Sequence, residues 1–312
     1  MLKIKCMKKT YHLCWSAGNG ILFRSKEDFI RGINCLCLAA YLTNSSLLAY
    51  AFMSNHVHIC IRTESLKSFI KKFRYPYTRY FNAKYMKEGT LGEKRFFCLE
   101  INGLHHLLTA IAYILRNPMH HGVAGTPLGY KYSSIRALFR KDLGWEDRID
   151  ILPDKHEYRH IPWHHSLPQH FKMDSDGMIL PECSIDVSDV EHQFSTARTL
   201  IYYLNRLSGE KWAKEQTQDP TAQPPISLKD IEKGIRYQDT RTMLSNEHGR
   251  SSYNSMTDLE LCREIDDEIL PHWGKRSIYE LSHTEKLDIK LFLIEKYHFQ
   301  SAQIDRCLEL KL

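Results

Sequence analysis

Two histidines that lie two residues apart, His56 and His58, are the side chains best placed in this sequence to hold a metal ion. Val57, Ile59 and Ile61 alternate with them, a pattern that predicts a β-strand. Side chains of a strand point to opposite faces with a period of two, so both imidazoles share one face. Neutral imidazoles arranged in this way can chelate one divalent cation. Two plain surface histidines are the alternative, because a chain with 17 histidines contains such a pair readily by chance.

A second pair of reactive side chains, Tyr113 and Asn117, follows about 57 residues after His56. Leucine and isoleucine recur at helical spacing over 102–117, which predicts a helix there. Pro118 is expected to end this helix, because the residue before a proline disfavours helical backbone. Residues four apart share one face of a helix, so the phenol and the amide are presented together. The alternative for the tyrosine is a plain structural position at the edge of a core.

These motifs, in this order, resemble those of the single-tyrosine HUH transposases, and among them the REP-associated tyrosine transposases. That family has His-hydrophobic-His and then a helix that ends in Tyr-Ile-x-x-Asn-Pro, as 113–118 does here. The segment 89–96, GTLGEKRF, is similar to the family's Gly-x-Leu-Trp-Gln-Gly-Arg-Phe. The segment 130–134, YKYSS, is similar to its Tyr-x-Trp-Ser-Ser. The resemblance covers roughly residues 8–140.

The resemblance implies a metal-dependent tyrosine transposase, a DNA nicking and joining enzyme of transposition and recombination. His56 and His58 would bind Mg²⁺ or Mn²⁺, with Asn117 as a third ligand. Tyr113 would attack a phosphodiester of single-stranded or hairpin DNA and form a 5′-phosphotyrosine intermediate. General chemistry agrees, because a metal polarises a scissile phosphate. A phenol with a pKa of about 10 also needs a nearby cation or base to attack well.

The chain departs from the family pattern at two places. Gly92 and Glu93 stand where the family has Trp-Gln, and 119–122, MHHG, stands where Val-Arg-Ala-Gly is usual. These changes concern substrate specificity more than chemistry. A domesticated, non-catalytic nucleic-acid-binding protein on the same scaffold is the alternative function. Members of the family occur as dimers and as monomers, so a homodimer remains open.

The distribution of charge favours a nucleic-acid partner. Residues 1–140 contain 21 Lys and Arg against 6 Asp and Glu, whereas residues 141–312 contain 22 against 31. A domain this basic favours a polyanion. Cations interleave with aromatics over the predicted helix 65–84, as in a platform for single-stranded DNA, and a buried aromatic stripe is the alternative. The candidate DNA-binding residues are Lys67, Lys71, Lys72, Arg74, Arg79, Arg95 and Arg116.

The predicted elements of the first part follow the order β-α-β-β-α-β-α. The strands are expected at 10–16, 47–53, 56–62 and 95–101, and the helices at 25–41, 65–84 and 102–117. This order predicts an α+β fold for residues 1–145, a ferredoxin-like antiparallel sheet with packed helices. The helix at 25–41 has Ser25 as its expected N-cap, with Asp28 three residues on.

The second part is expected to be less regular. Residues 146–190 read as an irregular connecting segment, and residues 191–312 as a helical accessory region. Helices are expected at 188–207, 228–245, 257–270, 284–297 and 301–310, with a linker at 214–227. The segment 284–310 has the outline of a helix-turn-helix, and a plain helical packing module is the alternative. Five histidines over 156–170 suggest a third function, a zinc-stabilised regulator, although no ligand spacing recurs among them.

Composition points to a soluble, cytoplasmic protein with no membrane partner, because the chain has no run of about 18 apolar residues and no signal peptide. The nine cysteines include no Cys-x-x-Cys. Buried free thiols are therefore expected in place of a disulfide framework.

Overall fold

The computed structural model describes residues 8–144, 160–162, 167–205, 256–297 and 299–310. Its first part follows the predicted order of elements. They are β1 (Lys9–Ser16), α1 (Lys26–Leu42), β2 (Ser46–Phe52), β3 (His56–Thr63), α2 (Leu66–Tyr85), β4 (Phe97–Ile101) and α3 (Leu104–His120). The strands form one antiparallel sheet in the order β2-β3-β1-β4. The predicted α+β fold, an antiparallel sheet with packed helices, is confirmed.

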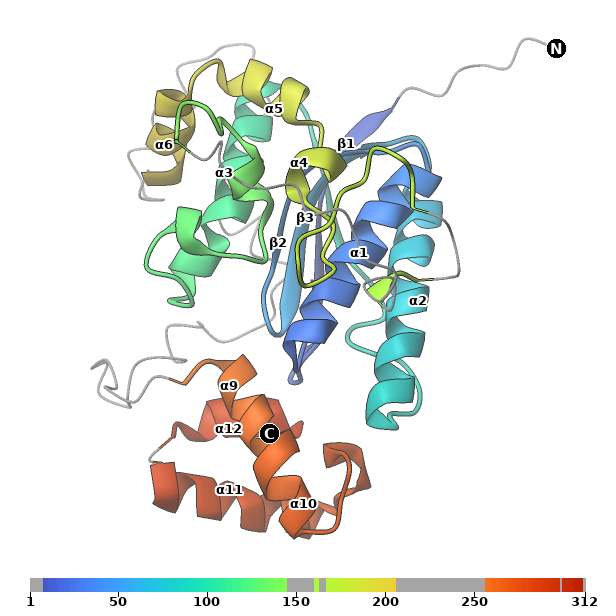
Figure 1. Cartoon of the computed structure of the whole chain (residues 1–312), viewed down its shortest axis with the longest axis vertical. Coiled ribbons are helices and arrows are strands. Elements are labelled where there is room, and N and C mark those ends of the chain that lie inside the picture. Colours follow the sequence, from blue (N-terminus) through green and yellow to red (C-terminus); the bar gives the residue numbers. More distant parts are fainter. Residues whose placement is uncertain (1–7, 145–159, 163–166, 206–255, 298, 311–312) are drawn as a thin grey trace, which may run out of the picture.

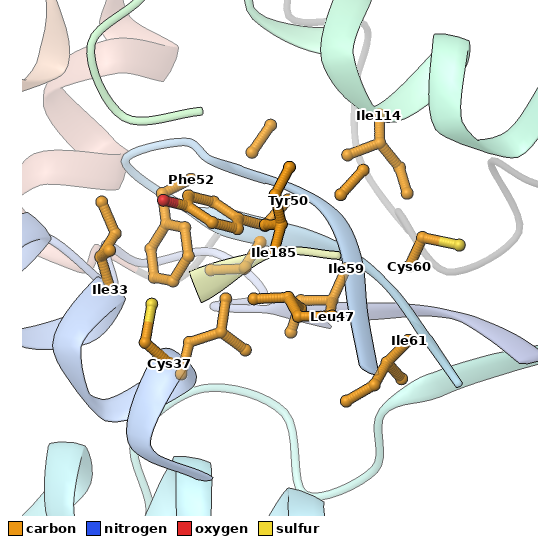
Figure 2. Close-up of a cluster of buried hydrophobic side chains, with 14 of the residues drawn as sticks. Ile33, Cys37, Leu47, Tyr50, Phe52, Ile59, Cys60, Ile61, Ile114 and Ile185 are labelled. Atoms are coloured by element: carbon orange, nitrogen blue, oxygen red, sulfur yellow. The ribbon is translucent and has the colours of Figure 1, made fainter. Parts of the chain in front are cut away.

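Helices cover both faces of this sheet, α1 and α2 on one side and α3 on the other (Figure 1). Trp15 of β1 pairs with Val57 of β3, and its ring lies edge-on to Phe73 of α2 at 5.7 Å. Figure 2 shows Ile33 of α1 on one side of β2 and β3 and Ile114 of α3 on the other. Both faces of β3 are therefore covered, and its histidines are buried rather than exposed.

The start of α1 is fixed by the predicted cap. Ser25 and Asp28 form a capping box, in which each side chain bonds the other residue's backbone. The Asp28 carboxylate is fully buried and also accepts hydrogen bonds from Tyr80, Lys84 and Tyr85 of α2. One carboxylate thus caps α1 and ties it to α2.

The prediction that Pro118 ends its helix is wrong, because α3 continues to His120. A proline so near the end removes only one backbone donor from the helix. The Pro118 carbonyl accepts a hydrogen bond from the Val123 amide at 2.9 Å, which closes the last turn. The helix therefore continues for three residues beyond Asn117.

Gly92, one of the departures from the family pattern, occupies a position that excludes a side chain. Its φ is +62°, and a Cβ there would lie 2.6 Å from the Ser16 carbonyl oxygen. We expect Gly92→Ala to lower the free energy of unfolding by about 1–3 kcal/mol, because backbone strain and contact both oppose the methyl group. Gly89→Ala is the matched control, since Gly89 has φ +82° but nothing within 4 Å of the added atom. Urea denaturation should show the larger loss for Gly92→Ala, and equal losses would contradict the role of the contact.

Residues 167–205 complete the core of the sheet domain. They contain α4 (Pro181–Ser184), α5 (Val187–Phe194) and α6 (Ala197–Asn205). Their buried side chains join the hydrophobic cluster of the sheet, among them Ile179, Val190, Phe194, Leu200 and Leu204. The helix predicted over 188–207 is split in two at Ser195, whose φ is +64°. Residues on both sides of the domain boundary expected at residue 190 thus belong to the same hydrophobic core.

The C-terminal unit, residues 256–310, encloses a second core. It contains α9 (Asp258–Arg263), a π-helical turn η5 (Glu264–Ile269), α10 (Leu270–His272), the short η6 (Ile278–Glu280), α11 (His283–Tyr297) and α12 (Ser301–Leu308). This region is helical, as predicted, and lies beyond one end of the sheet (Figure 1). The predicted linker 214–227 and helix 228–245 lie outside the described residues. Ile21, which precedes α1, belongs to this second core.

The last two helices have the succession expected of a helix-turn-helix, but most of the second helix is buried. Ile304, Cys307 and Leu308 of α12 are fully buried. Arg306 donates two hydrogen bonds to the Asp258 carboxylate, each at 3.0 Å. Helix α12 is therefore used for packing within the protein, whereas the second helix of a helix-turn-helix has to enter a DNA groove.

Arg24 joins the sheet domain to the C-terminal unit. Its guanidinium, 1% exposed, donates to both oxygens of Asp266 and to the Cys307 carbonyl at 2.7 Å. We expect Arg24→Ala to lower the free energy of unfolding by about 3–5 kcal/mol, because it leaves a carboxylate without its partner. Arg276→Ala is the control, since that side chain is 81% exposed in its pair with Glu280, and stability should hardly change. A thermal unfolding midpoint for Arg24→Ala equal to that of the control would contradict the expectation.

Two further expectations concern the whole described part of the chain. No helix within the described ranges is long and apolar enough to cross a membrane. Free thiols are buried as predicted at Cys14, Cys35, Cys37, Cys60, Cys262 and Cys307.

Candidate active site

The structure brings the two histidines together with the tyrosine and the asparagine. His56 and His58 leave β3 on the face that α3 covers. The rings of His58 and Tyr113 are 5.3 Å apart, nearly perpendicular. His56 Nε2 lies 3.0 Å from Asn117 Oδ1. Residues remote in the sequence thus form one cluster between the sheet and the helix.

The apolar side of α3 sets this arrangement. Ile111, Ile114 and Leu115 are fully buried, and of the predicted apolar positions only Leu104, at 53%, is largely exposed. Their packing presents the adjoining helix face to the sheet. Because Tyr113 and Asn117 are one turn apart, they meet two successive inward side chains of β3.

Burial keeps the two imidazoles neutral. It lowers the pKa of His56 to about 4, against a smaller opposing effect of the Asn117 hydrogen bond. Burial also lowers the pKa of His58 well below its ordinary value. A neutral imidazole has one N–H group and one nitrogen lone pair. At pH 7 each ring therefore offers one nitrogen to a cation without first losing a proton.

Each ring nitrogen of His56 faces an amide oxygen. Its Nδ1 lies 2.8 Å from Asn55 Oδ1, and its Nε2 faces Asn117 Oδ1. A neutral ring can donate to only one of these oxygens. With the proton on Nδ1, the Nε2 lone pair and the Asn117 oxygen are two donors that face a shared position.

His12 is a member of the cluster that sequence reasoning missed. Its Nε2 shares a hydrogen bond of 2.9 Å with His58 Nδ1, and burial lowers its pKa to about 3. His58 Nε2 is buried and has no hydrogen-bond partner among the described residues. The contact with His12 thus occupies one nitrogen of His58 and leaves the other for a ligand. The period of two in β1 was the available signal, since His12 shares a face with Cys14, the partner of His58.

The donor set fits a hard divalent cation. Imidazole nitrogen and amide oxygen are both acceptable to Mn²⁺, and Mg²⁺ usually keeps several waters beside few protein ligands. Within the described ranges, no three His, Cys, Asp or Glu side chains are grouped to hold a metal. The candidate set remains two imidazoles and one amide, those of His56, His58 and Asn117. Of the histidines proposed for zinc, His160 and His170 are described and join no such group, and 156, 164 and 165 lie outside the described residues.

The candidate DNA-binding residues of α2 lie in the other layer. Because α2 covers the face opposite α3, the sheet separates Lys67, Lys71, Lys72 and Arg79 from the histidine cluster. Arg74 donates to the carbonyls of Leu91 and Lys94, so it holds the loop before β4. Arg95 is exposed just before β4, and Arg116 adjoins Asn117 on α3.

The aromatic residues of α2 divide into two groups. Phe69, Phe73, Tyr77 and Phe81 are fully buried, as the core-stripe alternative expects. Tyr75 remains 56% exposed, with the Arg79 guanidinium 5.8 Å from its ring centre. The exposed part of the predicted platform is therefore confined to the outer side of α2.

The segment 130–134 protects an edge of the sheet. The Phe52 amide donates to the Tyr132 carbonyl at 2.9 Å, and the Tyr130 hydroxyl donates to the Phe52 carbonyl at 2.7 Å. Ser134 Oγ accepts from the Tyr50 amide at 3.0 Å. Backbone groups of Tyr50 and Phe52 on the edge strand β2 are thereby satisfied.

Comparison with solved structures gives several similarities, of which one is described here. No protein-family model matches the chain, and no curated protein matches it. The solved structure of a REP-associated tyrosine transposase bound to a REP hairpin is similar over 47% of this chain and 87% of that one. The sequence identity is 14% and the TM-score is 0.37.

Proposed function

We propose that this chain is a transposase-like DNA endonuclease and strand transferase that nicks and rejoins single-stranded or hairpin DNA. The observation that supports this best is the convergence of His56, His58, Asn117 and Tyr113 in one cluster. Two neutral imidazoles and an amide oxygen can hold a cation, and the phenol beside them is an oxygen nucleophile. The excess of Lys and Arg over residues 1–140 suits a DNA substrate.

Tyr113 begins the reaction. Its hydroxyl oxygen attacks the phosphorus of a phosphodiester in line with the bond to the 3′-oxygen. The new bond joins the phenol oxygen to phosphorus, and the bond from phosphorus to the 3′-oxygen breaks. The phenol loses its proton and the departing oxygen gains one, which leaves a free 3′-hydroxyl and a 5′-phosphotyrosine.

The same groups can reverse the step. A 3′-hydroxyl, from the same or another strand, attacks the phosphotyrosine, restores a phosphodiester and returns the proton to Tyr113. The ester bond is retained throughout, so rejoining needs no external energy source. Mg²⁺ or Mn²⁺ held by His56, His58 and Asn117 would polarise the scissile phosphate. Burial of the site strengthens each of these polar interactions.

A labelling experiment tests this function. The full chain is incubated with Mn²⁺ and single-stranded or hairpin oligonucleotides that are labelled at either the 3′ or the 5′ end. We expect a band on denaturing gels that carries the 3′ label and the protein but not the 5′ label, and EDTA should prevent it. DNA binding without an adduct would instead support the alternative, a non-catalytic nucleic-acid-binding protein.

His12 is expected to act as a positioning residue for the metal. His12→Ala should weaken the binding of Mn²⁺ by about 10- to 100-fold, because partners of metal-binding histidines typically contribute this much. His12→Gln offers an oxygen to the His58 Nδ1–H group and should recover part of the affinity. Calorimetric titration of Mn²⁺ without DNA measures this independently of catalysis. An unchanged affinity for His12→Ala, in a folded protein, would show that the 2.9 Å contact does not orient His58.

A further inference from the structure

A cavity of about 270 Å³ lies between the sheet domain and the C-terminal unit, beside the candidate active site. Its walls come from α1, the β2–β3 turn, the segments after α3, α9 and α12. His121 links it to the site, because this residue lines the cavity and its ring lies 5.1 Å from that of His56. His121 therefore belongs both to the wall of the cavity and to the surroundings of His56.

The lining suits a flat, uncharged group. Phe29 and Tyr132 line it and stack on each other with ring centres 4.2 Å apart, and Met256 closes it from the C-terminal unit. Lys131, the cation among the lining residues, is engaged by Asp174 and Asp176. The carboxylate of Asp258 also lies in the wall and is already paired with Arg306, so neither group gives the wall an uncompensated charge for a phosphate. A base, which has apolar faces and a hydrogen-bonding edge, matches this lining better than an anion does.

Polar groups of the wall can meet the edge of a base. Gln303 lines the cavity, and its Nε2 donates to the Met256 carbonyl. Ser54 Oγ donates to Asp258 Oδ2 at 2.8 Å across the boundary between the two parts. The first contact holds the Gln303 amide at a fixed position in the wall, where it can discriminate one base edge from another, and the second joins the two parts of the wall.

The spacing along α3 sets the distance from the nucleophile. Tyr113 and Asn117 are four residues apart on one face of the helix, and His121, four residues further on, caps its C-terminus. At 1.5 Å per residue, His121 lies about 12 Å along the axis from Tyr113. Stacked nucleotides rise about 3.4 Å each, so a base within about four nucleotides of the scissile phosphate can reach the cavity.

We propose that this cavity binds one nucleobase of the DNA strand, within about four nucleotides of the phosphate that Tyr113 attacks. The C-terminal unit then supplies one wall of the substrate site through Met256 and Gln303, while α12 stays packed. This inference rests on the proposed function for the identity of the strand. It assigns the C-terminal unit a role in reading a base beside the reaction centre.

Abasic scanning tests the proposal. An oligonucleotide is selected from a random-sequence pool by binding to the full chain, and each position is then made abasic in turn. Fluorescence anisotropy in EDTA measures affinity without cleavage. One position is expected to weaken binding by about 5- to 150-fold when its base is removed, because a stacked base contributes about 1–3 kcal/mol. At the other positions near the site the loss should be smaller.

Two cavity-filling variants connect that position to the cavity. Met256→Trp fills it from the C-terminal unit and Val123→Trp from the sheet domain. Each should bind the intact oligonucleotide about as weakly as the wild type binds the abasic one, and should be insensitive to the abasic change. Leu287→Trp, at a position 40% exposed on α11, is the matched control and should keep the wild-type profile. With two independent variants, the failure of one to fold leaves the other to decide.

Three results would overturn the proposal. The first is a flat abasic profile for the wild type, and the second is an unchanged profile in a folded cavity-filling variant. The third is saturable binding of a free nucleoside 5′-monophosphate together with a flat profile, which would assign the cavity to a free nucleotide. Absence of the covalent adduct would refute the proposed chemistry while leaving the abasic profile intact, so the two failures are distinguishable.

Discussion

Replacing Tyr113 by Phe is expected to lower the rate of covalent adduct formation by at least about 10³-fold, as removal of a nucleophile does in other enzymes. The substitution deletes the hydroxyl oxygen but keeps the ring, which is 4% exposed and packs 5.3 Å from His58. The fold and the affinity for DNA should therefore be almost unchanged. Denaturing gels with a 3′-labelled oligonucleotide measure the adduct, and anisotropy measures binding.

Tyr75→Phe is the matched control for that experiment. Tyr75 is 56% exposed on the outer side of α2, in the layer opposite the histidine cluster. Its variant should form the adduct at the wild-type rate. A denaturation-resistant adduct from Tyr113→Phe, with the same label and the same metal requirement, would place the nucleophile on another residue.

Replacing His56 by Ala is expected to lower metal-dependent cleavage by at least about 100-fold, since even the partners of metal ligands contribute 10- to 100-fold. The change removes one imidazole and leaves Asn117 Oδ1 without the nitrogen that lies 3.0 Å from it. The cleavage rate measured against Mn²⁺ concentration should show a weaker apparent affinity and a lower plateau. Circular dichroism checks that the variant is folded.

His170→Ala is the control for His56→Ala, because His170 is exposed and belongs to no grouped set of metal-binding side chains among the described residues. It should retain both the rate and the metal dependence of the wild type. If His56→Ala instead cleaves with an unchanged dependence on Mn²⁺, this imidazole does not ligate the cation.

Features that depend on local spacing were predictable from the sequence. The period of two in β3 placed both histidines on one face, and the capping box at Ser25 and Asp28 fixed the start of α1. The spacing of Tyr113 and Asn117 put them on one side of a helix. Each of these follows from backbone geometry that a single segment determines by itself.

Features that depend on pairing between distant segments were not predictable. The contact between His12 and His58 was not predictable, because the register that pairs Cys14 with His58 is set by the packing of the whole sheet. The two uses of the α2 aromatics could not be separated by periodicity alone, because the same stripe suits a core and a stacking surface. Pro118 was misjudged because a proline near the end of a helix removes only one backbone donor.

Arg24 shows the largest separation of this kind, and it has a consequence for biosynthesis. Its partners Asp266 and Cys307 follow it by 242 and 283 residues. At about 5–20 residues per second, a ribosome needs on the order of 10 to 60 s to supply them after Arg24 emerges. Until then, Arg24 and Ile21 lack the partners that bury them in the complete chain. A ribosome that stops early releases a chain in which both side chains are uncovered. We therefore expect proteases that recognise exposed apolar surface to degrade unfinished chains in preference to finished ones.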